Sequence, residues 1–345
     1  MCIATIITTF IASTFGILLL SSPTSAAEEF FKDKTIRFVV GFEAGGGFDA
    51  YARLIARHFP KYIPGNPTTI VINMPGAGSL VAANDVFARA KPDGLTIGTF
   101  TGPLVLQHVL GLQGVAFDGR RFGWLGVPIV DHGVCFMTKG SGIKTLDEWL
   151  ASKRPVKIGA AAPGSTTADI PKILRAAIGL PMQVVSGYKG TVQIRMAAET
   201  GEVDGGCWGW DSIKPTMSNL ITSGEINIVT QNMMQPHSDL PNVPLSINYA
   251  KTQEARQLMQ IISDAYGITT RPYAVPPGVP QDRLQMLQKA FLDTLKDPEA
   301  IAEATKGKMD INPVDGQTVA KIFASFYDYS PSLISRLKEI SGATK

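Results

Sequence analysis

The chain has 345 residues, of which 45% are hydrophobic and 18% are charged, and its formal net charge is +3. This length allows two domains of ordinary size. The mild positive charge, without a dense Lys/Arg run, excludes a nucleic-acid-binding protein, although it is compatible with a small anionic ligand.

The N-terminal segment predicts export. Residues 1–27 are uncharged and mostly apolar, with a hydrophobic core at 11–20, and Ser25, Ala26 and Ala27 offer the small residues that a signal peptidase accepts. The usual basic residues before the core are absent. Because the apolar run is short for a bilayer span, we expect a signal peptide over 1–27 and a periplasmic protein, with an uncleaved anchor as the alternative.

Two cysteines, Cys135 and Cys207, follow the predicted signal peptide. An oxidising compartment would permit a disulfide between them. Both lie in apolar, strand-like runs, where a buried free thiol is common. We therefore expect free thiols here rather than a disulfide.

The first predicted elements form a strand, a glycine turn and a helix. An apolar strand over 36–40 leads into the glycines at 45–47, and the apolar spacing from Tyr51 onward predicts a helix with Asp49 as its N-cap. Glycines allow a close backbone approach, and a helix start presents free N–H groups. The turn is either an anion cradle or an ordinary strand-to-helix connection.

The same alternation continues along the chain. Further strands are predicted at 69–73, 95–100, 124–129, 134–138, 156–161, 182–185, 203–210 and 226–230. Further helices are predicted at 80–90, within 141–153, at 168–178 and 191–200, within 211–223, and over most of 250–263, 280–305 and 316–340. This order predicts an α/β fold with mostly parallel sheets, helices on both faces and a cleft at the strand ends. Composition changes near 131–133 and between 235 and 270 predict two domain crossings.

Four loops have the same form, small residues between a strand and a helix start, at 42–49, 75–79, 163–167 and 187–191. The last two add hydroxyl groups, from Ser165, Thr166, Thr167, Tyr188 and Thr191. The four together favour a polar ligand held by backbone and hydroxyl groups, although α/β folds have such turns in any case.

The sequence lacks the residue spacings that known nucleotide-binding, metal-binding and catalytic motifs require. The glycine turn at 45–47 has no P-loop lysine, and the second strand ends without the acid of a dinucleotide site. The four histidines show no zinc spacing, and Ser165 lacks a nucleophile elbow. We expect no metal, no cofactor and no catalytic residues. Cys207 as a nucleophile, or Glu43 with Asp49 as an acid/base pair, remains the enzymatic alternative.

Several short motifs resemble one known family when taken together. They are F-E-A-G-G-G-F-D-A-Y-A-R at 42–53, N-M-P-G-A-G-S at 73–79, P-D-G at 92–94, G-Y-K-G at 187–190, G-E-V-D at 201–204, L-P-N-V-P at 240–244 and V-P-P-G-V-P at 275–280. In this order they resemble the substrate-binding receptors of tripartite tricarboxylate transporters, the Bug receptors.

The resemblance implies a two-lobe periplasmic binding protein fold of the type II, flytrap-like kind. The predicted domains are 33–130 with 255–345 as a discontinuous first lobe, and 131–254 as the second. It also implies a monomeric receptor that captures a small carboxylate between the lobes and delivers it to integral membrane transporter subunits. The alternatives are an α/β hydrolase or transferase acting on a carboxylate, and a sensory binding protein.

The resemblance places a ligand carboxylate against the glycine loop. The implied contacts are Phe42, Ala44, Gly45, Gly46 and Asp49 on one side and Ser165, Thr166, Tyr188 and Gly190 on the other, with Asp49 stiffening the loop. We add Gly78 from the second loop and Trp208 as candidates. We expect Trp208 and Trp210 to face opposite sides, so that one of them can line the cleft. Glu43 departs from the pattern, because its charge would repel a carboxylate unless it points away or pairs with a basic group.

Overall fold

The protein is described here from a computed structural model that covers residues 30–342. The predicted signal peptide over 1–27 lies outside the described residues. Within this range, no helix combines the length and the apolar character needed to cross a bilayer.

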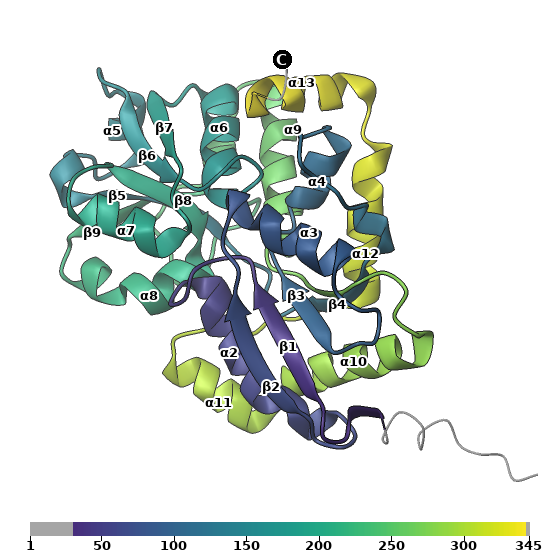
Figure 1. The fold of residues 1–345 in the computed structure, drawn as a ribbon. Coiled ribbons are helices and arrows are strands. Elements are labelled where there is room, and N and C mark those ends of the chain that lie inside the picture. The colour runs from purple at the N-terminus through teal and green to yellow at the C-terminus, as the bar shows by residue number, and fades with distance from the viewer. Residues whose placement is uncertain (1–29, 343–345) are drawn as a thin grey trace, which may run out of the picture.

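Two sheets organise the chain (Figure 1). The first has the order β11-β4-β10-β3-β1-β2, formed by β1 (Thr35–Val40), β2 (Thr68–Asn73), β3 (Thr96–Thr99), β4 (Gly123–Val127), β10 (Tyr273–Val275) and β11 (Val314–Asp315). The second has the order β7-β6-β8-β5-β9, formed by β5 (Gly133–Thr138), β6 (Val156–Ala160), β7 (Met182–Ser186), β8 (Gly205–Gly209) and β9 (Ile226–Gln231). The chain therefore leaves the first sheet after β4 and returns to it at β10.

Helices cover both sheets. They are α2 (Gly47–His58), α3 (Leu80–Ala88), α4 (Leu104–Val109), α5 (Leu146–Leu150), α6 (Thr166–Ile178), α7 (Thr191–Glu199), α8 (Trp210–Thr222), α9 (Gln253–Ile261), α10 (Gln281–Thr294), α11 (Pro298–Lys306), α12 (Gly316–Ser325) and α13 (Pro331–Ser341). We call the first sheet with α2 to α4 and α10 to α12 the first lobe, and the second sheet with α5 to α8 the second lobe.

Alternating side chains of β1 show how the first lobe is layered. Ile36 and Phe38 are fully buried in one apolar cluster with residues of α2 and α10, whereas Val39 packs in another with residues of α3 and α12. Successive residues of a strand point to opposite faces, so this sheet is covered by helices on both sides.

Both sheets are mixed, although most strands of each run in one direction, as the sequence predicts. In the first, β1 pairs in parallel with β2 and β3, but β10 runs antiparallel to both β3 and β4. In the second, β5 runs antiparallel to β8 and β9. The sequence pattern missed β10 and β11 because three-residue and two-residue strands carry too few residues to show a period.

The C-terminal helices are shorter than predicted. The predicted helix over 280–305 is split into α10 and α11, and that over 316–340 into α12 and α13. Asp297 and Ser330 cap the second helix of each pair, with a proline at its first position. Such caps and prolines favour a new helix start over continuation.

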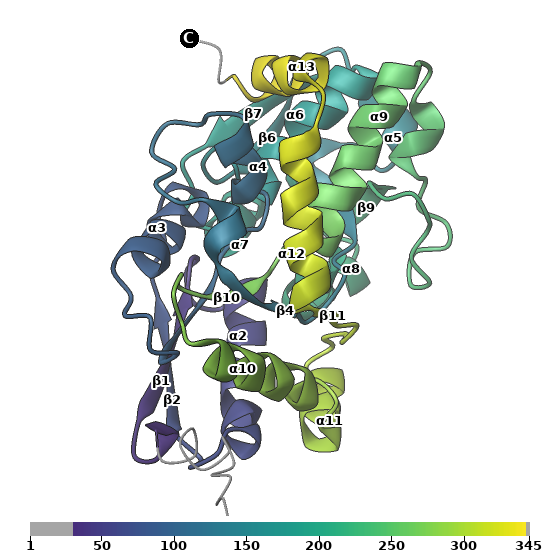
Figure 2. The same ribbon diagram turned by 90° about the vertical axis from the view of Figure 1, so that its right-hand side faces the viewer.

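The contacts of α9 and α13 cross the predicted domain limits. Both helices contact α6 of the second lobe, and Lys172 Nζ on α6 donates to the Ser341 carbonyl at 3.0 Å. Figures 1 and 2 both show α13 beside α6. The limits at 131–254 and 255–345 stay a prediction, with these two helices as the segments in question.

Cys135 and Cys207 form a disulfide, so the expectation of free thiols is wrong. They are directly opposite each other on the antiparallel strands β5 and β8, and their Cα atoms lie 4.1 Å apart. The predicted strands were right, but only their pairing and register, which sequence patterns do not give, bring the two sulfur atoms together.

Candidate ligand-binding site

A pocket that is partly open to solvent lies between the two lobes, and about 510 Å³ of space lies among its wall atoms when the open side is counted. The first lobe lines it with Phe42, Glu43, Gly46, Gly47 and Phe48, and the second with Ala161, Ser165, Thr166, Thr167, Gly190, Thr191, Trp208, Gly209 and Ser212. The segments that join the lobes add Asp131, Thr270 and Arg271. We call this space the inter-lobe cavity.

The glycine turn brings the start of α2 to the cavity. Gly46 is the N-cap residue, with φ −86°, and no side chain caps the helix. The left-handed conformation is at Gly45, with φ +84°. Since the first N–H groups of a helix have no partner within it, the Gly46–Gly47 turn offers donors and the positive end of a helix dipole.

Asp49 lies inside the first turn of α2, so its prediction as the N-cap is wrong. Its carboxylate accepts the Gly45 N–H at 2.9 Å, Arg53 Nε at 2.9 Å and Asn73 Nδ2 at 2.9 Å. Burial raises the pKa of Asp49, but these hydrogen bonds outweigh it and hold the pKa below its usual value. The residue does not line the cavity, and its contacts tie the glycine turn to β2.

Arg271 is the residue that the sequence reasoning missed. Its side chain is 1% exposed, and its guanidinium lies 4.7 Å from the ring centre of Tyr51 and 5.2 Å from that of Phe48. One nitrogen donates to Asp131 Oδ2 and to Ser212 Oγ, whereas Nε and the other terminal nitrogen have no partner. That second terminal nitrogen lies 3.1 Å from where a Cβ on Gly47 would be. A buried cation with free N–H groups therefore adjoins the start of α2.

Asp131 and Asp211 surround this cation with two buried carboxyls. Asp131 is 1% exposed and Asp211 is 2% exposed, and each has one oxygen without a partner. Burial first, and then the neighbouring Asp131, raise the pKa of Asp211 to about 8. Asp211 therefore holds its proton more tightly than an ordinary aspartate, whereas Asp131 is the carboxyl that bonds the Arg271 guanidinium.

The joining segments meet at this cluster. Asp131 lies between β4 and β5, and Arg271 lies two residues before the first residue of β10. The Asp131 N–H also donates to the Gly267 carbonyl at 3.1 Å, so the two segments are bonded through backbone as well as side chains. A lone arginine within the mostly uncharged run at 265–281 was the available sequence signal.

The second-lobe hydroxyl loop lies on the opposite wall. Ser165 Oγ donates to the Ala162 carbonyl at 2.7 Å, and Thr167 Oγ1 accepts the Ala161 N–H at 3.0 Å. Thr166 Oγ1 lies 3.3 Å from Thr101 Oγ1 of the first lobe. These bonds fix the predicted residues Ser165 and Thr166 in the wall of the cavity.

The remaining predicted residues divide into two groups. Phe42, Gly46, Ser165, Thr166, Gly190 and Trp208 line the cavity, whereas Ala44, Gly45, Asp49, Gly78 and Tyr188 do not. Gly78 lies at the lobe boundary, where a Cβ would be 3.2 Å from both the Ala162 carbonyl and Ser165 Cβ. The exposed Tyr188 hydroxyl donates to Glu202 at 2.6 Å.

Trp208 lies in the cavity wall, in edge contact with Phe136 at 4.9 Å between ring centres. Two strand residues that are two positions apart share a face, so alternation gives no reason for the two indoles to point in opposite directions. Trp210 is in any case outside the strand, because β8 ends at Gly209 and α8 begins at Trp210. Both indoles belong to the same buried cluster, and Trp210 Nε1 donates to Asp239 at 3.1 Å.

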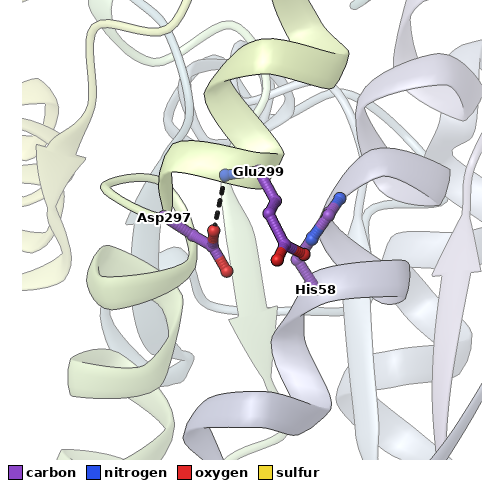
Figure 3. Close-up of side chains that lie close together, drawn as sticks. All are labelled: His58, Asp297 and Glu299. Carbon is purple, nitrogen blue, oxygen red and sulfur yellow. Dashed lines mark hydrogen bonds between the residues drawn. The ribbon is translucent and has the colours of Figure 1, made fainter.

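Two groups of acidic and histidine side chains outside the cavity resemble metal sites. His58, Asp297 and Glu299 converge in Figure 3, and Asp211, His237 and Asp310 form the other group. Lys61 Nζ bonds both carboxylates of the first group, at 3.1 and 2.5 Å, and Lys214 Nζ bonds Asp310 and Asp239, each at 2.8 Å. A lysine ammonium thus already provides the counter-charge in each group.

The comparison with known families identifies the chain. A family model described as the tripartite tricarboxylate transporter family receptor matches residues 52–338. The chain belongs to this receptor family. The resemblance found in the sequence motifs is thereby confirmed.

Relatives and solved structures agree with this membership. A UPF0065 protein from Cupriavidus necator, encoded in the gbd 5′ region, is 24% identical over 344 residues, which cover 94% of each chain. A Bordetella pertussis UPF0065 protein is 40% identical over 95 residues, covering 27% of this chain and 28% of the relative. The periplasmic binding protein BugD superimposes with a TM-score of 0.73 at 20% identity, covering 90% of this chain and 99% of BugD.

Two further solved structures contain ligands. MatC from Rhodopseudomonas palustris with bound malate has a TM-score of 0.70 at 19% identity, covering 89% of this chain and 99% of MatC. A second R. palustris protein, with adipate, has a TM-score of 0.70 at 18% identity, covering 90% of this chain and 97% of its own. These likenesses confirm the two-lobe periplasmic binding protein fold of this receptor.

Proposed function

We propose that this receptor captures a small carboxylate in the inter-lobe cavity and delivers it to the membrane subunits of a tripartite tricarboxylate-type transporter. The observation that carries the proposal is that the Arg271 guanidinium lies beside the start of α2. The Arg271 side chain is buried, and two of its nitrogens have no hydrogen-bond partner. It adjoins the start of α2, where no side chain caps the first N–H groups, and both line the cavity between the lobes. Charged and dipolar donors of this kind favour a carboxylate.

The remaining predicted contacts have supporting parts in this proposal. Phe42 and Trp208 provide apolar walls, and Ser165, Thr166 and Gly190 provide the opposite side. Gly45 and Asp49 hold the turn, and Gly78 lets the lobes approach. The solved relatives that contain malate and adipate support a carboxylate as the ligand class.

A non-enzymatic role is part of the proposal. One enzymatic alternative needed Cys207 as a free thiolate, but this sulfur is bonded to Cys135. The other needed Glu43 and Asp49 as an acid/base pair, but Asp49 does not line the cavity. No cofactor or metal is required for capture by hydrogen bonds and charge. We expect the receptor to act as a monomer, because one chain contributes both walls of the cavity.

The test is a thermal-shift screen of the mature protein against mono-, di- and tricarboxylates that include malate and adipate. Each acid is paired with its amide as a matched neutral control. A ligand at a hundred times its dissociation constant should add about 2.7 kcal/mol to the free energy of unfolding. Mass spectrometry of the recovered ligand should return it unchanged. Chemical conversion, or the lack of any carboxylate hit, would contradict the proposal.

Location is tested separately. The proposal places the mature protein in the periplasm after cleavage behind Ala27. N-terminal sequencing of the periplasmic fraction should then begin near Ala27 or Glu28. An intact Met1 on cytoplasmic protein would contradict it.

A further inference from the structure

We propose that this receptor selects ligands with one carboxylate over those with two, because Glu43 fills the second carboxylate position with its own side chain. The inference rests on the proposed function and narrows its ligand class. It comes from Glu43, the residue that departs from the family motif and whose role the sequence left open.

Glu43 reaches from the first lobe to the start of α7 in the second lobe. Its Oε1 accepts the Gln193 N–H at 3.0 Å. A Cβ on Gly190, the N-cap residue of α7, would lie 3.1 Å from the same oxygen. Gly190, as a glycine, has no side chain with which to cap α7. The Glu43 carboxylate therefore occupies the anion-binding position at this helix start.

The starts of α2 and α7 meet at the cavity. A Cβ on Gly46, the N-cap residue of α2, would lie 3.1 Å from Thr191 Oγ1, on the first residue of α7. Two helix starts facing one cavity could hold the two ends of a dicarboxylate. Here one of them already holds the carboxylate of Glu43, so only the start of α2 is left for the ligand.

The charges on the cavity wall lead to the same conclusion. Among the lining residues within 30–342, the charged ones are Glu43, Asp131 and Arg271. Asp131 is paired with Arg271, whose unpartnered terminal nitrogen lies on the α2 side. A first ligand carboxylate meets these donors, whereas a second would meet Glu43. Like charges brought together in a partly desolvated site are disfavoured.

The rest of the wall suits an apolar ligand body. The rings of Phe42, Phe48 and Trp208 line the inter-lobe cavity beside the two helix starts. Phe42 and Phe48 pack against each other with their ring centres 4.5 Å apart and their planes tilted by 41°. These surfaces bury hydrocarbon favourably but offer no donor to a second carboxylate.

The test compares acids of matched carbon skeleton by titration calorimetry. The pairs are hexanoate with adipate and benzoate with terephthalate, and a third pair is built on the skeleton of the best hit from the carboxylate screen. The parent protein should bind the monoacid at least about tenfold more tightly in the pairs that bind. Glu43→Gln keeps an oxygen that can accept the Gln193 N–H but removes the charge, so the preference should shrink to within about threefold.

Glu199→Gln is the matched control, because Glu199 is an exposed residue at the other end of α7, the helix that Glu43 contacts, and does not line the cavity. It should keep the preference of the parent. A parent that binds the diacid as tightly as the monoacid overturns the inference but leaves the proposed function standing. An unchanged preference in Glu43→Gln overturns it as well. If no carboxylate binds the parent at all, the proposed function fails, and this inference fails with it.

Discussion

Glu43 Oε1 accepts the backbone N–H of Gln193 at 3.0 Å, although 150 positions separate the two residues in the sequence. The bond joins the two lobes, because Glu43 belongs to the loop that leads into α2 and Gln193 belongs to the first turn of α7. On the other side of the boundary, Gln107 Nε2 of the first lobe donates to the buried Asp169 of α6 at 2.8 Å. These two contacts hold the lobes together beside the cavity.

The glycine turn should tolerate a side chain at one position and not at the next. Gly46→Val would push its side chain toward Thr191, which lies 3.1 Å from the Cβ position, and should abolish carboxylate binding while the protein stays folded. Gly45→Ala is the matched control. Its Cβ would be 3.9 Å from Val192, so it should bind ligand, with a loss of about 1 kcal/mol of stability from its positive φ. Calorimetric titration and urea unfolding separate the two effects, and equal binding by Gly46→Val and the parent would mean that the ligand lies elsewhere.

Removing Arg271 alone should be costly for the fold. Arg271→Gln leaves Asp131 as a buried charge without its partner, which should lower the free energy of unfolding by about 3–5 kcal/mol. The double variant Asp131→Asn/Arg271→Gln removes both charges and should recover much of this stability. Both variants should bind the carboxylate more weakly than the parent. Denaturant unfolding measures the expected losses of stability, and calorimetric titration of the double variant measures its carboxylate binding. Tight carboxylate binding by the double variant would exclude Arg271 from the site.

The pH dependence of the free energy of unfolding should reflect the titration of Asp211. Burial and the neighbouring Asp131 raise its pKa from 3.8 to about 8 in the folded protein. The folded state therefore retains a proton that the unfolded chain has lost, so this contribution is present below about pH 4 and is lost as the pH rises toward 8. Between pH 5 and 8, the parent should lose stability more steeply than Asp211→Asn, by up to about 1.4 kcal/mol per pH unit.

Unfolding curves at several pH values measure this difference. The variant comparison is needed because two other buried groups titrate with opposite effects: burial raises the pKa of Asp169 and lowers that of His132. Both are present in the parent and in Asp211→Asn, so their contributions largely cancel in the difference. Parallel curves for the two proteins would show that Asp211 is ionised in the folded state.

The disulfide should stabilise the protein without taking part in binding. Both cysteines are fully buried, and the bond closes a loop between positions 72 residues apart. Replacing both with alanine should lower the free energy of unfolding by about 2–4 kcal/mol. Reductant should have the same effect on the parent under unfolding conditions and none on the double variant. A parent whose unfolding curve does not respond to reductant would have free thiols.

The sequence by itself determined the local elements and the family. Strand β1, the glycine turn and helix α2 follow from an apolar run, three glycines and a helical period, all within about twenty residues. The receptor family followed from short motifs that recur in order. Such signals are contained in neighbouring residues, and long-range packing does not have to be known to recognise them.

Only the tertiary structure decided how the site is built. Arg271 bonds Asp131, although the two residues are 140 positions apart in the sequence. Cys135 lies opposite Cys207 because of the register in which β5 and β8 pair. Strand order placed β10 antiparallel between β3 and β4, which carries Arg271 to the start of α2. Glu43 reads as an unfavourable charge in the sequence and becomes the cap of a helix in the other lobe. Each of these contacts depends on how distant segments pack, because a side chain acquires its charge partner and its burial only when the lobes come together.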